Sequence, residues 1–164
     1  PIMSQTVSPD RVQLRPVTAE DDELLLAIYT STRDEQLRQM GWAEEHIRMF
    51  VKMQWEAQTK HYRTHFTADE YIVLVDLKPV GRIIVQRSND EILLVDMAVL
   101  TEHRNKKIGS QLMKALTEES DSGGKSIRLH VLKFSPAVRL YERFGFTKIG
   151  EDVVNFEMQR QPLT

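Results

Sequence analysis

The sequence predicts an α/β protein in which helices lie on both faces of one mixed, mostly antiparallel β-sheet. Three apolar stretches follow one another within residues 71–100, separated only by short turns, which is typical of an antiparallel meander. A helical pattern at 108–119 then connects the strand at 92–100 to a strand at 127–132, and such a connection makes the two strands parallel. Two long helical patterns precede the meander.

Composition limits the class of protein. At 164 residues, with 41% hydrophobic and 28% charged residues, the chain fits a single globular domain over residues 1–164. A net charge of −2 disfavours a chain-wide nucleic-acid or membrane partner. The absence of cysteine excludes disulfides, thiolate metal sites and a cysteine nucleophile. We expect a cytoplasmic protein without a metal cofactor, in which residues 1–10 form a flexible extension.

The first elements are a strand and a helix. Residues 12–16 alternate apolar and polar side chains, and the proline that ends this stretch confines the strand to a sheet edge or a strand end. Thr18 is expected to cap the helix that follows, with Asp21 completing a box-like cap. We expect this helix to be broken near residues 30–34 and to stop at Gly41.

A second helix is expected over residues 43–65. Its apolar and aromatic residues recur at steps of three and four, which is typical of a face packed on a core. The stripe consists of Ile47, Phe50, Val51, Trp55, Gln58 and Tyr62. If it overhangs a cleft instead, its aromatic residues could shape a pocket for a substrate.

The meander begins with a strand at residues 71–77. Lys78, Pro79 and Gly81 are expected to form the turn into the next strand, and residues 88–90 the turn into the strand at 92–100. The helix after that strand is expected to break at Ser122–Gly124.

The C-terminal third supplies a short helix and a closing pair of strands. Ser135 is expected to cap the helix, Pro136 to occupy its first position and Gly145 to terminate it. Strands are expected at residues 146–149 and 153–158. The predicted order of elements is therefore β-α-α-β-β-β-α-β-α-β-β.

A basic loop precedes the helix at 108–119. Arg104, Lys106 and Lys107 lie where the buried strand gives way to this helix. Free backbone N–H groups at a helix start, the helix dipole and nearby cations all favour a bound anion, so the loop is a candidate phosphate site.

Two motifs carry a resemblance to a known family. The stretch LLVDMAVLTEHRNKKIGSQLM is similar to the acetyl-CoA signature Arg/Gln-x-x-Gly-x-Gly/Ala of the GCN5-related N-acetyltransferase (GNAT) superfamily. The stretch SPAVRLYERFGF looks like the Asn-x-Ala-x-x-Leu-Tyr-x-x-x-Gly-Phe segment of that superfamily. STRDEQL, FVKMQWEAQ and HY resemble one bacterial branch of it. The resemblance covers essentially the whole chain.

The resemblance implies a fold and an activity. The fold is a GNAT-like one in which the parallel strands at 92–100 and 127–132, the fourth and fifth, are splayed for the cofactor. The activity is acetyl-CoA-dependent N-acetyltransferase, with the acetyl group passing from CoA directly to a primary amine of an acceptor. Relatives are often homodimers, so a homodimer is expected here too.

Two positions depart from the family pattern. Lys107 replaces the first glycine of the signature, while Arg104 and Gly109 are kept. If this position needs a positive φ, a lysine there costs about 1 kcal/mol. Ser135 replaces the usual asparagine and can still cap its helix.

The resemblance implies cofactor contacts at the end of the fourth strand, in the basic loop and at the two helix starts after it. The Met97 N–H would face the thioester carbonyl and the Val99 N–H the pantetheine amide. The full set is Met97, Ala98, Val99, Arg104, Asn105, Lys106, Lys107, Ile108, Gly109, Ser110 and Ser135. Taken alone, these residues also fit an ordinary buried strand and a solvated basic turn.

Catalytic residues follow from the same comparison. Tyr141 is implied as the general acid that protonates the leaving thiolate, and its alternative role is that of a core aromatic residue. Asp96 is the candidate general base because it is a carboxylate in an apolar strand; it could also be a structural partner of a neighbouring backbone group or of His130. His130 itself or a water chain could serve as the base.

By placement alone, the acceptor pocket is assigned to residues of the first two helices. These residues are Tyr29, Arg33, Trp55 and Tyr62. Two other functions stay open: a non-catalytic acyl-CoA-binding module, and an α/β domain that binds another phosphate ligand.

Overall fold

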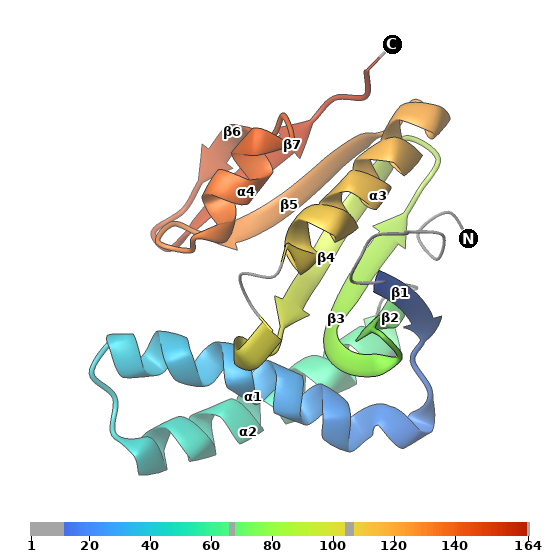
Figure 1. The fold of residues 1–164 in the computed structure, drawn as a ribbon. Helices are drawn as coiled ribbons and strands as arrows, with labels where there is room; N and C mark the ends of the chain where they lie inside the picture. Colours follow the sequence, from blue (N-terminus) through green and yellow to red (C-terminus); the bar gives the residue numbers. More distant parts are fainter. Residues whose placement is uncertain (1–11, 66–67, 104–106, 164) are drawn as a thin grey trace.

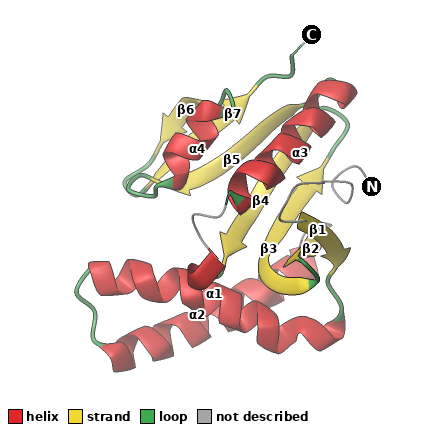
Figure 2. Cartoon of the chain, in the orientation of Figure 1, coloured by secondary structure: helices red, strands yellow, loops and turns green. Residues whose placement is uncertain are grey.

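The computed structural model describes residues 12–65, 68–103 and 107–163, without the side chains of 58–65 and 101. The predicted extension at residues 1–10 lies outside this description. Figure 1 shows one sheet with helices packed against it, and Figure 2 shows the same elements by type. In chain order these are β1 (Val12–Pro16), η2 (Ala19–Asp21), α1 (Asp22–Gln39), α2 (Glu44–His65), β2 (Asp69–Val75), β3 (Lys78–Arg87), β4 (Glu91–Val99), η3 (Thr101–His103), α3 (Ile108–Gly123), β5 (Ser126–Leu132), α4 (Ala137–Arg143), β6 (Thr147–Glu151) and β7 (Asn155–Arg160).

The sheet is mixed and mostly antiparallel, as predicted. Its seven strands lie in the order β1-β2-β3-β4-β5-β7-β6. Only β4 and β5 run parallel, because α3 connects them; the other neighbours are antiparallel. β1, which carries the proline, lies at an edge, where a missing backbone donor is tolerated.

The two faces of the sheet are covered by different helices. Ile83 of β3 is fully buried in the main core, to which α3 and α4 contribute. Its neighbour Arg82 lies under the ring of Trp55 from α2, so α1 and α2 cover the opposite face. α1 and α2 also share a smaller cluster of their own, built from Tyr29, Leu37, Ile47 and Val51 with Phe50 and Trp55 against it.

The predicted break in the first helix is wrong, since α1 continues from Asp22 to Gln39. Tyr29 and Leu37, on either side of residues 30–34, are both buried in the cluster with α2. Thr32 Oγ1 donates to the carbonyl of Ile28, which ties the polar stretch to the preceding turn. Packing therefore overrides the weak helical preference of this stretch.

The predicted turn at residues 78–81 is also wrong. Asp76 and Leu77 make it, with φ values of +50° and +68°, and β3 already begins at Lys78. A leucine rarely adopts positive φ, so nothing in its residue type indicated this turn. Gly81 is instead needed within the strand, because a Cβ there would lie 2.3 Å from the Ala98 carbonyl oxygen.

The predicted helix ends are largely confirmed. Thr18 and Asp21 form a capping box, and Gly41, Gly124 and Gly145 have positive φ just beyond the three helices they follow. The closing strands β6 and β7 begin one and two residues later than expected.

Two searches of the described residues found nothing. No helix there is both long enough and apolar enough to cross a membrane. No three His, Cys, Asp or Glu side chains in the same residues are grouped so that they could hold a metal ion.

Candidate active site at the opening between β4 and β5

The site is built around the point where β4 and β5 part. Their pairing runs from Glu91–Ser126 to Leu94–Leu129 and stops there, although β4 continues to Val99 and β5 to Leu132. Figure 1 shows the two strands diverging beyond this point. The register between β3 and β4 shifts at the same level, which is where a bulge bends a strand. The predicted splay is confirmed.

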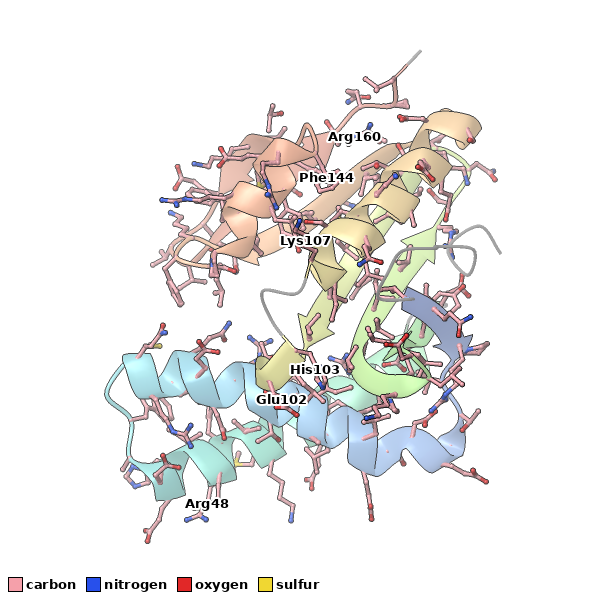
Figure 3. The ribbon with its side chains drawn as sticks, in the orientation of Figure 1. Arg48, Glu102, His103, Lys107, Phe144 and Arg160 are labelled. Carbon is pink, nitrogen blue, oxygen red and sulfur yellow. The ribbon has the colours of Figure 1, made fainter. Side chains whose placement is uncertain are left out.

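The start of α3 faces the same region. Lys107 precedes the helix with φ +62° and ψ +18°. Figure 3 labels this residue at the base of α3. The first helical hydrogen bond runs from the Gln111 N–H to the Lys107 carbonyl at 3.1 Å. The N–H groups of Ile108, Gly109 and Ser110 therefore have no acceptor within the helix, which makes this end suitable for an anion. Arg104, Asn105 and Lys106 lie outside the described residues.

α3, α4 and β4 meet closely at Gly109. A Cβ on this glycine would lie 3.1 Å from Leu140 Cδ2 of α4 and 3.8 Å from Met97 Cε of β4. The structure thus brings together Met97 and Gly109, two predicted cofactor residues far apart in the sequence. The absence of a side chain at Gly109 is what permits this approach.

Ser135 caps the second helix of the site. Its Oγ accepts a hydrogen bond from the Ala137 N–H at 3.1 Å, as an N-cap oxygen does. The capping hydrogen bond is present, but the predicted N-cap position is shifted by one residue: Pro136 precedes α4, which begins at Ala137.

Tyr141 lies on the buried side of α4. Its ring centroid is 5.7 Å from that of Phe146. Burial, and secondarily the negative charge of Asp96, raise the pKa of the Tyr141 hydroxyl well above its usual value. At neutral pH the hydroxyl is therefore a proton donor, which suits an acid and not a base.

Asp96 is held by Arg82. Arg82 Nη2 donates to Asp96 Oδ2 at 2.7 Å, and Arg82 Nη1 lies 3.5 Å from Glu70 Oε2. The Asp96 side chain remains about one third exposed, whereas that of Arg82 is only 4% exposed. The sequence suggested a backbone group or His130 as the structural partner of Asp96, whereas the structure gives the guanidinium of Arg82.

His130 is the first residue of β5 beyond the paired segment. Leu129 and Val131 on either side of it are buried in the core with α3 and α4, so His130 points to the opposite face. Its Nε2 lies 3.3 Å from Glu157 Oε2. Asp96 lies on that same face, because its partner Arg82 contacts α2 there. The two candidate bases thus flank the opening.

Three of the four predicted acceptor residues come together. The rings of Tyr29 and Trp55 have centroids 5.4 Å apart, and Arg33 Cζ lies 5.2 Å from the Tyr29 centroid. The Tyr29 hydroxyl donates to Gln54 Oε1 at 3.3 Å, so this tyrosine is a satisfied core residue. Trp55 is better placed, because it packs on Arg82 and thereby joins α2 to Asp96. The side chain of Tyr62 lies outside the description.

Arg82 is the residue beside the candidate site that sequence reasoning missed. Among the described residues, its Nε is one of two buried side-chain polar atoms without a hydrogen-bond partner. A signal was present, because a carboxylate within an apolar strand requires a cation and β3 carries an arginine in the stretch RIIVQR.

Comparisons with known proteins agree with this geometry. The family model described as acetyltransferase (GNAT) domain matches residues 67–148, half of the chain. The PaiA N-acetyltransferase from Thermoplasma acidophilum, solved with coenzyme A, superposes with a TM-score of 0.71 at 19% identity, covering 92% of this chain and 99% of that one. Arabidopsis thaliana Naa50 with the bisubstrate analogue CoA-Ac-MVNAL gives 0.64 at 17% identity, covering 92% and 98%.

An acetyltransferase from Thermus thermophilus also superposes, with a TM-score of 0.67 at 16% identity over 92% of this chain and 96% of that one. The structural likenesses establish the fold, and the family match extends from β2 across the opening, α3 and α4 into β6. The chain therefore belongs to the GNAT family of acetyl-CoA-dependent N-acetyltransferases.

Proposed function

We propose that this protein transfers an acetyl group from acetyl-CoA directly to a primary amine that reaches the thioester from the face of Asp96 and His130. The observation that carries the proposal is the end of β4–β5 pairing at Leu94 and Leu129. Beyond it, the pantetheine arm can lie along β4 as an added strand. The buried Tyr141 then lies on one face of the opening and the candidate bases on the other.

Each proton has a place in this scheme. The acceptor ammonium first gives a proton to Asp96, which frees the nitrogen lone pair. The nitrogen then attacks the thioester carbon, and the Met97 N–H donates to the oxyanion that forms. As the C–S bond breaks, Tyr141 protonates the thiolate and recovers a proton from the new amide nitrogen. No covalent enzyme intermediate is required.

The phosphate end of the cofactor is assigned to the start of α3. The N–H groups of Ile108, Gly109 and Ser110 would bind the diphosphate, with Lys107 beside it. The predicted contacts at Arg104, Asn105 and Lys106 remain part of this proposal. Ser135 would contribute by fixing the start of α4.

The setting of the enzyme is also proposed. The net charge of −2 supports an enzyme that binds neither nucleic acid nor a membrane. A bacterial enzyme is proposed from the resemblance to one bacterial branch of the family, and a cytoplasmic location is proposed with it. A homodimer is proposed from the family resemblance.

The test measures release of free CoA thiol from acetyl-CoA over a panel of amines. The panel holds diamines, amino acids, aminoglycosides and a peptide beginning MVNAL, since Naa50 was solved with an analogue of that sequence. We expect turnover with at least one class. Calorimetric binding of acetyl-CoA without any turnover would favour the non-catalytic module, and no binding would favour another phosphate ligand.

The base is tested by substitution. With an active acceptor, Asp96→Asn is expected to lower kcat about a hundredfold or more, the scale of one general base. His130→Gln serves as the comparison. If only the His130 variant loses activity, the two roles are exchanged.

A further inference from the structure

Two carboxylates on one face of the sheet share the guanidinium of Arg82. Ile84 of β3 pairs with Glu70 on β2 and with Asp96 on β4, so the two carboxylates lie in one row across three strands. The strands that carry them are two spacings apart, about 10 Å. Arg82 lies two residues before Ile84 on the same face and joins them. Its Nη2 donates to Asp96 Oδ2 at 2.7 Å, and its Nη1 lies 3.5 Å from Glu70 Oε2.

Water has little access to this guanidinium. The Arg82 side chain is only 4% exposed, and Cζ lies 5.6 Å from the ring centroid of Trp55. A buried cation that loses its counter-charge is strongly destabilising, because solvent cannot compensate it. The side chains of Glu70 and Asp96 are each about one third exposed, so both can also meet solvent. Arg82 therefore needs an ionised carboxylate beside it throughout the reaction.

The proposed reaction removes one of these two counter-charges. When Asp96 takes a proton from the acceptor ammonium, an N–H bond breaks, an O–H bond forms and the carboxylate becomes neutral. Among the described residues Arg82 bonds only Oδ2 of Asp96, which leaves Oδ1 to the ammonium. With Asp96 as its sole partner, the buried cation would oppose this transfer. Glu70 keeps the guanidinium paired until Asp96 gives its proton to solvent.

We propose that Glu70 is a positioning residue for the acetyl transfer: it holds Arg82 while Asp96 is protonated, and so lets Asp96 act as a base beside a buried cation. The inference rests on the proposed function and on Asp96 as its base. The charged or titratable groups around Asp96 in the described part of the chain come from β2, β3, β5 and α4, and α2 adds an uncharged ring. They are Glu70, Arg82, His130 and Tyr141, with Trp55.

The main test is Glu70→Gln, which removes the charge and keeps the size of a partly exposed side chain. With an active acceptor, we expect kcat to fall about five- to tenfold and the KM for acetyl-CoA to change less than about twofold. The acid limb of the kcat/KM profile should move about one unit to lower pH, because Arg82 then favours ionised Asp96 more strongly.

Two further variants show whether the effect passes through Arg82 and Asp96. Arg82→Gln removes the cation, so the acid limb should move to higher pH, the opposite direction to Glu70→Gln. In an Asp96→Asn protein, Glu70→Gln should lower kcat no further, because the residue through which it acts is gone. The second comparison does not depend on whether Arg82→Gln folds.

Glu91→Gln is the matched control. Glu91 lies on β4 itself, its side chain is 30% exposed against 31% for Glu70, and it pairs with Arg128 at 3.0 Å. The same substitution therefore breaks a comparable ion pair without touching Arg82. We expect kcat and the acid limb to match the wild type, which excludes a general effect of removing a carboxylate from this sheet.

Four results would overturn the inference while wild-type turnover keeps the proposed function in place. They are wild-type kinetics in Glu70→Gln, equal effects of the Glu70 and Glu91 changes, an undiminished effect of Glu70→Gln in the Asp96→Asn protein, and wild-type activity of Asp96→Asn itself. Absence of wild-type turnover with every amine would instead remove the proposed function.

Discussion

At the scale of single residues, Tyr141 is the side chain whose surroundings bear most directly on the chemistry. It is buried in the main core, and its hydroxyl stays protonated because burial and the charge of Asp96 raise its pKa. Tyr141→Phe removes the proton donor but keeps the ring. We expect kcat to fall about a hundredfold with little change in calorimetric acetyl-CoA binding. Turnover at the wild-type rate would leave Tyr141 as a core aromatic residue only.

The same burial gives a pH dependence of stability. Because the pKa of Tyr141 is raised above the ordinary value of 10.0, the unfolded state releases this proton first as pH rises. The stability contribution is therefore complete below pH 10 and declines above it. Relative to Tyr141→Phe, the wild type should lose about 1 kcal/mol by about pH 11 in urea unfolding, since the other tyrosines are common to both. Parallel curves from about pH 8 to pH 11 would contradict this.

Lys107 has a conformation that its residue type disfavours. Its φ of +62° occurs at the position where the family signature has glycine. Lys107→Gly should therefore stabilise the protein by up to about 1 kcal/mol in urea unfolding. Lys114→Gly, at an exposed position within α3, should destabilise it by about 1 kcal/mol. Effects of the same sign at both positions would mean that Lys107 is not strained.

At the scale of elements, the spacing of β3 and β4 behind the opening depends on Gly81. A Cβ there would lie 2.3 Å from the Ala98 carbonyl oxygen and 3.1 Å from Val99 Cα, both backbone atoms that cannot turn aside. Gly81→Ala should cost about 2–3 kcal/mol and weaken acetyl-CoA binding, because β4 must shift.

The control for this change is Gly150→Ala in β6. Its Cβ would meet only Glu157, with Oε1 at 3.5 Å, an ordinary contact. The expected change in the free energy of unfolding is within about 0.5 kcal/mol. Similar losses at both glycines would show that backbone approach at Gly81 is not the cause.

Some elements could be predicted from sequence because their signals are local. The edge strand β1, the Thr18–Asp21 cap and the ends of the helices at Gly41, Gly124 and Gly145 each depend on neighbouring residues. The continuity of α1 could not, because it depends on burial of Tyr29 and Leu37 against α2. The turn at Asp76–Leu77 could not either, since its conformation is imposed by the pairing of β2 with β3.

At the scale of the whole molecule, two short motifs were enough to indicate the fold, because each marks a crossover onto the same side of the sheet. They also located the start of α3 and Tyr141. The ion pair between Asp96 and Arg82 could not be predicted from residue types alone. It depends on the register between the antiparallel strands β3 and β4. The arrangement of the proposed acceptor residues was the least predictable part, because it depends on how α1 and α2 pack.

Cofactor binding should stabilise the whole fold. Acetyl-CoA at a hundredfold excess over its Kd is expected to add about 2.7 kcal/mol to the free energy of unfolding. Hydrogen exchange should slow most at the end of β4 and the start of α3, where its arm and phosphates would lie. Stabilisation by inorganic pyrophosphate equal to that by acetyl-CoA would instead favour a simple phosphate ligand.

The parting of β4 and β5 at Leu94 and Leu129 has one more consequence. Each strand keeps its outer neighbour, β3 or β7, so in the described part of the chain the sheet consists of two halves joined by four residue pairs, Glu91–Ser126 through Leu94–Leu129. The unpaired edges of β4 and β5 can bind a ligand whose hydrogen-bonding groups are spaced like those of a strand. Acyl carriers with amides at that spacing would bridge the halves, whereas thioesters of plain alkyl thiols would leave them apart. Selectivity for the acyl carrier would thus depend partly on the spacing of its hydrogen-bonding groups and not only on contacts with side chains.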